Sequence, residues 1–193
     1  MRAVKSPEER REEILGAAIR VFAGKGYDKT TISDIAKEIG ISQGLCYRYY
    51  QSKEEIYDEA LENYADYIVQ ENLKRYQLQG KTFKEMILGV SGHVSGYADA
   101  ERGQSALYAM FHSGENRKLH DQLFARIAGK LVPYITQFIT QANQTGEIHI
   151  SDPETMAYFV IYGQMGILMN PNMPEEDCQR RIQQSLLEMF HLN

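Results

Sequence analysis

Apolar residues recur every three or four positions along most of this chain, which is the spacing of helices that bury one face. The first such segment opens at Ser6 and Pro7, where Ser6 can cap a helix whose first position is Pro7, and it ends at Gly24 and Gly26. Apolar and polar residues never alternate strictly for long, as they would in strands. The pattern therefore predicts an all-α fold of about nine helices.

Two short segments with helical spacing lie on either side of Gly40. Thr31 can cap the first, and Ser42 can cap the second, which is expected to be about seven residues long. Two short helices joined by a tight turn match the helix-turn-helix motif, here over residues 31–50, whose second helix enters the major groove of DNA. The sequence therefore predicts an N-terminal three-helix DNA-binding domain over residues 1–52.

The rest of the chain, residues 53–193, is expected to form a helical bundle that one long helix joins to the N-terminal domain. That helix starts at a capping signal at Ser52 and should connect the two halves rigidly. Pro133 is expected to kink a later helix. The expected helices of this half cover residues 52–79, a stretch from residue 82, residues 101–112, 117–144 and 151–169, and a last segment that ends near residue 190.

The net charge of −5 is unevenly distributed along the chain. Residues 1–53 hold ten Lys and Arg and seven Asp and Glu, which gives +3. Residues 54–193 hold eleven and nineteen, which gives −8. Such asymmetry indicates different partners for the two parts, with nucleic acid as the expected partner of the basic part. Chance clustering of solvated charges is the alternative.

Three residues at the start of the second motif helix are expected to lie against the base edges. Gln43 can pair with adenine through two hydrogen bonds, and Leu45 can touch a thymine methyl group. Gly44 lets the backbone approach DNA closely. Cys46 should face inward, against the first motif helix.

A run of bulky residues with polar tips, Tyr47-Arg48-Tyr49-Tyr50, follows directly. These four side chains cannot all point into a core, so some must face a polar partner outside. The hydroxyl groups of Tyr47 and Tyr49 can donate to phosphates, and Arg48 and Lys53 add positive charge. Thr31 and Ser33 complete the expected set of DNA contacts.

A family pattern is met by Thr30, Thr31, Ile35, Ala36, Gly40, Ile41, Ser42, Gly44, Tyr47, Tyr49, Tyr50, Ser52, Lys53, Glu54 and Ile56. On these residues the segment 8–68 resembles the DNA-binding domain of the TetR family of transcriptional regulators. The segment departs from the usual pattern at Leu45 and Cys46, which affects the expected base preference rather than the fold. The remaining two thirds of the chain agree with the family in length and helix count.

The C-terminal half is rich in aromatic residues and Met. The resemblance implies a ligand pocket inside this bundle, and buried tyrosines need partners for their hydroxyl groups. A plain core without a pocket is the alternative. We expect a small, largely apolar effector that loosens DNA binding through the helix starting at Ser52. The expected lining residues are Tyr64, Tyr67, Met86, His93, Tyr97, Tyr108, Phe111, His112, Phe138 and Tyr162.

A homodimer is expected because one short recognition helix contacts few bases, whereas a dimer reads two half-sites. The last two helices could form a four-helix bundle with their copies about a two-fold axis. Alternatively, their apolar stripe packs only within one chain. The expected interface consists of Ala157, Gly163, Gly166, Cys178, Ile182, Leu186 and Met189.

Several classes of protein find little support in the sequence. The five histidines show no ligand spacing with Cys or carboxylates, so neither a metal nor another cofactor is expected. Phosphate-binding loops and nucleophile elbows are absent, which argues against an enzyme. Gly89, Gly92 and Gly96 have near-helical spacing, which suits close helix packing.

The cellular setting is predicted from three features. The N-terminus is charged, unlike a signal peptide, and no apolar run approaches ~20 residues. Cys46 and Cys178 lie far apart without a pairing framework, which favours a reducing compartment. We therefore expect a cytoplasmic protein without a membrane partner.

Two functions remain open on the sequence alone. The first is a ligand-responsive transcriptional regulator that binds a palindromic site in double-stranded DNA; we expect a repressor, although the sequence does not distinguish it from an activator. The second is a helical interaction module that keeps this fold but acts through a protein partner.

Overall fold

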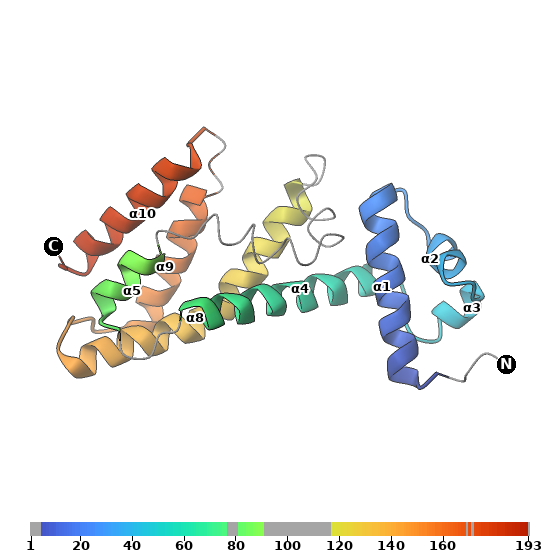
Figure 1. Ribbon diagram of the computed structural model, residues 1–193, viewed down its shortest axis with the longest axis horizontal. Helices are drawn as coiled ribbons and strands as arrows, with labels where there is room; N and C mark the ends of the chain where they lie inside the picture. Colours follow the sequence, from blue (N-terminus) through green and yellow to red (C-terminus); the bar gives the residue numbers. More distant parts are fainter. Residues whose placement is uncertain (1–4, 77–80, 91–116, 169, 171, 193) are drawn as a thin grey trace. The chain divides into compact units, whose positions relative to one another are not determined.

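The computed structural model describes residues 5–76, 81–90, 117–168, 170 and 172–192, and within these ranges it contains eight helices and no strand (Figure 1). The prediction of an all-helical fold is thereby confirmed. The helix expected over residues 101–112 lies outside the described residues, as does the expected end of the long helix near residue 79.

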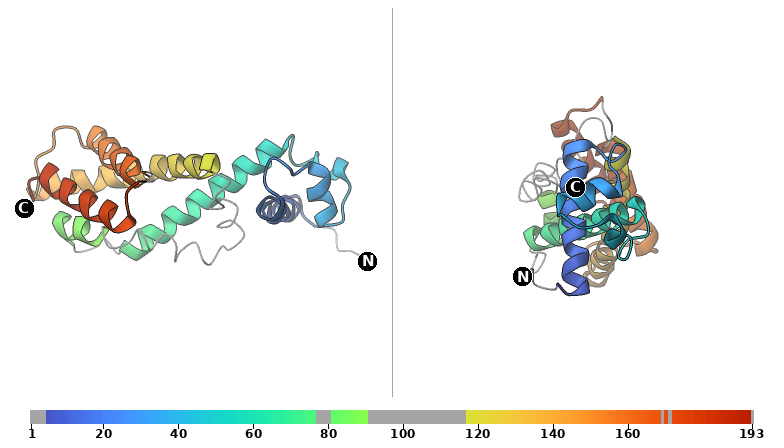
Figure 2. Two further views of the ribbon diagram at one scale, coloured as in Figure 1. Left: turned by 90° about the horizontal axis from the view of Figure 1, so that it is seen from above. Right: turned by 90° about the vertical axis from the view of Figure 1, so that its right-hand side faces the viewer.

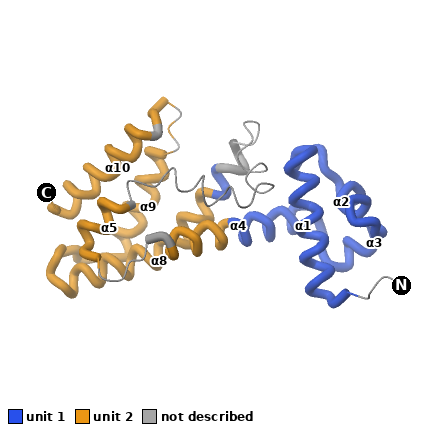
Figure 3. Tube along the Cα trace, viewed as in Figure 1, with its two compact units in different colours: residues 1–64, 101–123 blue, residues 65–100, 124–193 orange. Residues whose placement is uncertain are grey.

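The chain divides into two compact units (Figure 3). Unit 1 consists of residues 1–64 and 101–123, and unit 2 of residues 65–100 and 124–193. The division between the units falls within helix α4, Lys53–Tyr76, the long helix that the sequence predicts to join the two halves. The cause is burial: Ile56 and Leu61 of α4 are fully buried in unit 1, and the ring of Tyr57 lies 6.4 Å from that of Phe22.

Helix α1, Pro7–Lys25, begins as the sequence predicts. The Ser6 hydroxyl accepts a hydrogen bond from the Glu9 backbone N–H (3.1 Å), and the Glu9 carboxylate accepts one from the Ser6 N–H (2.7 Å). This reciprocal pair satisfies two N–H groups that a helix start leaves open. The helix ends at Gly26, whose φ of +85° is costly for a residue with a side chain.

Helices α2, Ile32–Glu38, and α3, Gln43–Cys46, form the two arms of the predicted helix-turn-helix. In the left view of Figure 2, α1 is seen nearly end-on, with α2 and α3 beside it. Gly40 makes the turn with a φ of +64°. Helix α3 is shorter than predicted, because after Cys46 the backbone tightens into turns: the Arg48 N–H donates to Leu45 O at 3.2 Å rather than to an oxygen four residues back.

Unit 2 is built from the later residues of α4 together with α5, Phe83–Val90, α8, Arg117–Thr145, α9, Pro153–Leu168, and α10, Glu175–Met189. Helix α10 packs alongside α5 and α9 (Figures 1 and 2). Phe83 and Phe190 meet edge to face at 4.8 Å between ring centroids and join α5 to the end of α10.

Three expectations for the helices of unit 2 have clear outcomes. Thr82 and Glu85 form the predicted capping box, with bonds of 3.1 Å and 2.9 Å. Pro133 lies inside α8, as predicted. Helix α9 starts at Pro153, close to the predicted start at residue 151, and the Asp152 carboxylate accepts the Thr155 N–H at 3.0 Å.

None of the helices in the described ranges has the length and hydrophobicity needed to cross a membrane. Within those same ranges, His, Cys, Asp and Glu side chains form no group of three or more that could hold a metal ion.

Candidate nucleic-acid interface and ligand cavity

The residues of α3 and of the turn after it differ in how exposed their side chains are. Cys46 and Tyr50 are buried, at 0% and 1% exposed, and Tyr47 is 49% exposed. The run of four bulky residues is thereby explained, because Tyr50 points inward while Tyr47 and Arg48 face solvent. Of the predicted DNA contacts in this segment, Gln43, Gly44, Tyr47 and Arg48 are exposed, and Leu45 and Tyr49 are half-buried.

The two predicted contacts on the first motif helix are placed differently. Thr31 is exposed, but its hydroxyl donates to Asp34 Oδ2 (2.7 Å) and accepts the Asp34 N–H (3.2 Å), so it serves mainly as the cap of α2. Hydrogen bonds from Lys25 and Thr31 hold the pKa of the Asp34 carboxyl well below its usual range. Ser33 is half-buried on the following turn.

Lys53 has a structural contact in addition to its predicted role. Its Nζ donates to the Tyr27 carbonyl oxygen at 2.8 Å and lies 4.2 Å from the centroid of the Tyr27 ring. An ammonium group has three donors, so N–H groups remain that can face a phosphate. Burial and the neighbouring Glu54 raise the pKa of Tyr27 to about 12, so this ring stays neutral.

Positive charge without an acidic partner gathers near α2 and α3. On α1, Arg11, Arg20 and Lys25 each pair with a carboxylate from α2 or α4. By contrast, among the described residues no carboxylate forms a salt bridge with any of the exposed cations Lys29, Lys37 and Arg48. Lys29 and Lys37 were missed in the sequence, although the positive balance of residues 1–53 was a signal for them.

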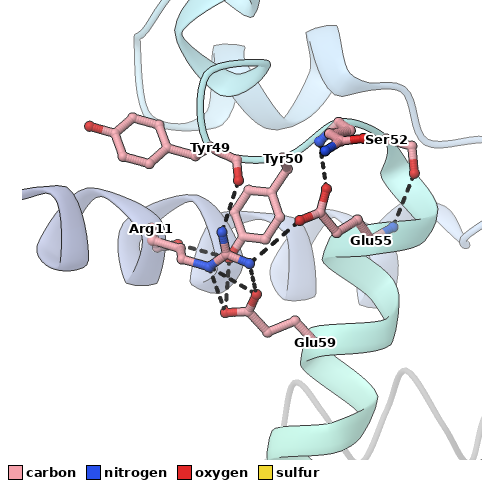
Figure 4. A network of polar contacts seen from close by, with 7 residues as sticks. Arg11, Tyr49, Tyr50, Ser52, Glu55 and Glu59 are labelled. Carbon is pink, nitrogen blue, oxygen red and sulfur yellow. Dashed lines mark hydrogen bonds and ion pairs between the residues drawn. The ribbon is translucent and has the colours of Figure 1, made fainter.

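A network of hydrogen bonds and ion pairs between α1, α4 and the turn after α3 stabilises the position of that turn (Figure 4). The Arg11 guanidinium on α1 forms a forked pair with Glu59 of α4, including Nε to Oε2 at 3.0 Å, and donates from Nη1 to the Tyr49 carbonyl oxygen at 2.9 Å. A second carboxylate, that of Glu55, lies 3.6 Å from Nη2. The Tyr50 ring lies 4.3 Å under the guanidinium carbon, and its hydroxyl donates to Glu59 at 3.1 Å.

This network joins α1 to two segments 38 or more positions further along the chain, the turn after α3 and the first half of α4. Hydrogen bonding to Glu59 raises the pKa of Arg11, and burial raises the pKa of Tyr50, so both groups keep their ordinary protonation. Because Arg11 binds the backbone at Tyr49, the turn after α3 is fixed to α1 and α4. Nothing in the local sequence pattern signalled this role for Arg11.

Unit 2 contains a cavity of about 120 Å³. Of the residues predicted to line a pocket, Met86 and Phe138 do so, whereas Tyr64, Tyr67 and Tyr162 are not among the lining residues. The other five predicted residues, His93, Tyr97, Tyr108, Phe111 and His112, lie outside the described residues. The described residues that line it are Asn72, Leu73, Phe83, Met86, Ile87, Leu131, Tyr134, Ile135, Phe138, Ile139, Val160, Ile161, Gln164, Leu186 and Phe190.

The residues predicted for a dimer interface fall into two groups. Ala157, Cys178, Ile182 and Leu186 are at most 8% exposed and pack within one chain, as the alternative held, because α5, α9 and α10 close over them. Gly163, Gly166 and Met189 are exposed. Three aromatic residues of α9 that were not predicted for this surface are exposed as well: Tyr158, Phe159 and Tyr162, at 48%, 67% and 44%.

Residues 14–60 match the family model described as "Bacterial regulatory proteins, tetR family". The biofilm operon icaADBC negative transcriptional regulator IcaR of Staphylococcus epidermidis is 31% identical over an alignment that covers 58% of this chain and 66% of IcaR. Two further curated relatives are matched over 33% and 30% of their own length. The first unit is thus a helix-turn-helix domain of the bacterial regulator type. The chain belongs to the TetR family.

Solved structures of the same fold match nearly the whole chain. A TetR-family transcriptional regulator from Mesorhizobium loti has a TM-score of 0.68 at 16% identity, with 96% of this chain and 98% of that one covered. Thermus thermophilus FadR, solved in complex with lauroyl-CoA, has a TM-score of 0.56 at 19% identity, with 93% of each chain covered. The chain therefore has this fold in both of its units.

Proposed function

We propose that this protein is a transcriptional repressor that binds double-stranded DNA through α3 and the turn after it. The observation that supports the proposal is that this reading segment, residues 43–50, exposes several polar side chains, while the exposed cations Lys29, Lys37 and Arg48 form no salt bridge with a carboxylate in the described chain. Gln43 stands at the start of α3, where side chains meet bases, and the exposed cations Lys29, Lys37 and Arg48 can bind phosphates. The name of IcaR as a negative regulator supports repression rather than activation.

The proposed repressor acts as a homodimer. Tyr158, Phe159 and Tyr162 form a contiguous exposed apolar surface along α9, and such surfaces on soluble domains mark sites of association. The rings of Tyr158 and Tyr162 stack at 6.1 Å, which presents a flat face to a partner. A Cβ added to Gly163 or Gly166 of the same helix would meet no atom of the described neighbouring residues within 4 Å, so a second helix can approach closely there.

A small, largely apolar ligand is proposed to release the repressor. The cavity of unit 2 has an apolar lining, and a neighbour of the same fold was solved with lauroyl-CoA. Helix α4 supplies residues to both units, up to Tyr64 for unit 1 and from Ala65 for unit 2, so it is the element through which the two sites would be coupled. Such coupling must be reciprocal: a ligand that weakens DNA binding tenfold is itself bound tenfold more weakly by the DNA complex.

Selection of random DNA fragments on the purified full-length protein tests this function. We expect enrichment of a two-fold symmetric site whose half-sites lie one helical turn apart, roughly 34–36 Å. A helical interaction module that acts through a protein partner would yield no enriched sequence.

The matched relatives are named as regulators, which agrees with the expectation that the protein is not an enzyme. A bacterial repressor works where the chromosome lies, and we place this one in the cytoplasm.

Gln43→Ala should relax the choice of base at one position of each half-site, at a cost of roughly 1–3 kcal/mol, because a bidentate contact to that base is lost. Arg48→Ala is the matched control: it should weaken binding to all sequences alike and flatten the dependence on salt. Binding of single-base operator variants at several salt concentrations separates the two effects. If Arg48→Ala changed the preferred base and Gln43→Ala did not, the assignment of reading and anchoring residues would be reversed.

A further inference from the structure

Asn72 on α4 is a polar side chain in a mostly apolar cavity wall. It is 4% exposed, and its Nδ2 donates to the Ile68 carbonyl oxygen one turn back, at 2.8 Å. That bond fixes the orientation of the amide, because the opposite orientation would set two oxygens against each other. The other end of the amide, Oδ1, receives no hydrogen bond from any residue that the structure describes.

Oδ1 is not one of the fully enclosed polar atoms, and a carbonyl oxygen that is presented at a mostly apolar cavity wall without a donor is unfavourable for the fold. Leucine has nearly the same volume and would suit the surrounding lining better if this position served only the fold. Because the lone acceptor borders an open cavity, a donor from a bound molecule can satisfy it. Asn72 thus has the properties of an anchoring group rather than of a packing group.

The wall around Asn72 restricts the charge of such a molecule. Fifteen described residues line the cavity, and none of them carries a charge. Besides Asn72, only Tyr134 and Gln164 among these fifteen are polar. Moving an ionised group from water into such surroundings is very costly without a partner charge. The lining therefore favours an uncharged molecule.

The size of the cavity restricts the molecule further. Its volume of about 120 Å³ is close to that of an engineered apolar cavity of about 150 Å³ that binds benzene. Phe83, Phe138 and Phe190 supply aromatic faces and edges to the wall. A molecule of about one ring fits these dimensions without rearrangement of the helices.

We propose that the cavity of unit 2 binds an uncharged, ring-sized apolar molecule that carries one hydroxyl or N–H group and donates it to Asn72 Oδ1. This specifies, and rests on, the ligand response proposed above. Asn72 then selects for donors, while the apolar wall selects against carboxylates and other ions.

Two probes of nearly equal size, phenol and fluorobenzene, and the somewhat larger benzoate test the chemistry when each is titrated into the full-length protein at neutral pH and followed by calorimetry. Phenol donates a hydrogen bond, fluorobenzene has the same ring without a donor, and benzoate is charged. We expect phenol to bind about tenfold more tightly than fluorobenzene, and benzoate to bind least. Equal affinity for phenol and fluorobenzene, absence of binding by both, or tightest binding by benzoate would overturn the proposal.

Asn72→Leu keeps the side-chain volume and removes the acceptor. It should abolish the preference for phenol while fluorobenzene binds as before, and Gln164→Leu should leave the preference in place. Thermal unfolding of both variants shows that they are folded. A phenol preference that survives in Asn72→Leu contradicts the assignment.

Titration of operator DNA with and without phenol separates this proposal from the function on which it rests. Phenol bound with the expected preference but without effect on DNA affinity would refute the coupling and leave the ligand chemistry intact. DNA binding that is sensitive to a charged effector, but not to phenol, would refute the ligand chemistry and leave the regulator intact.

Discussion

Phe159→Glu should convert the protein to a monomer and lower its affinity for an operator by at least about 100-fold. Phe159 is the most exposed large apolar residue that the structure describes, at 67%, and it lies next to Tyr158 and Tyr162 on the proposed dimer surface. A carboxylate there would be desolvated without a partner on association. Loss of the dimer removes the gain of linked half-site binding, which amounts to about 10²–10⁴-fold.

Light scattering at micromolar concentration and operator binding measure these two effects on one sample. Leu88→Glu is the matched control, since Leu88 is 45% exposed on α5 and lies outside the proposed surface. This variant should keep both the dimeric mass and the operator affinity. A dimeric Phe159→Glu variant, or a wild-type protein that is monomeric, would show that the aromatic surface of α9 has another role.

Arg11→Met should lower the free energy of unfolding by about 2 kcal/mol and weaken operator binding. The substitution keeps an apolar stem but removes the fork to Glu59 and the donor to the Tyr49 carbonyl oxygen. The Arg11 side chain is 41% exposed, so the expected loss is below the 3–5 kcal/mol of a fully buried pair. DNA binding suffers because the segment after α3 loses its tie to α1.

Thermal and urea unfolding measure the first effect, and the expected decrease in Tm is roughly 4–8 °C. Arg20→Met is the control on the same helix, because the Arg20–Glu38 pair is more exposed and holds no backbone oxygen near α3. Exposed pairs contribute about 0–1 kcal/mol, so this variant should remain close to the wild type. Equal effects of both substitutions would mean that the network in Figure 4 is an ordinary surface ion pair.

Local interactions made much of the fold predictable from the sequence. The capping boxes at Ser6, Thr31 and Thr82 depend on residues three positions apart, and all three were found. The length of α3 was overestimated, because helical spacing cannot distinguish a regular helix from turns with tighter hydrogen bonds. The exact position of the division within α4 depends on long-range packing of residues such as Tyr57 against α1, which spacing along the chain does not encode.

The exposure of Gln43 and Tyr47 was predictable because the helix-turn-helix pattern fixes which positions face outward, and their contacts with DNA stay a prediction. The contact between Arg11 and Glu59 joins residues 48 positions apart, and no local pattern encodes it. In α9 and α10 both faces carry apolar residues, so the spacing alone could not show that Ile182 is buried and Phe159 exposed. Asn72 was missed because a polar residue on a helix is usually solvated.

The position of Gly44 on α3 has space for a larger side chain. A Cβ placed there would meet no atom of the described neighbouring residues within 4 Å, and the backbone lies in an ordinary helical conformation. A larger residue would even favour the helix, since glycine costs about 0.5–1 kcal/mol relative to alanine. Chains that diverge from this one can therefore carry a larger residue beside Gln43 without destabilising the domain. Under the proposed function, such a change would alter the approach to DNA while leaving folding intact, so the two properties can evolve separately at this position.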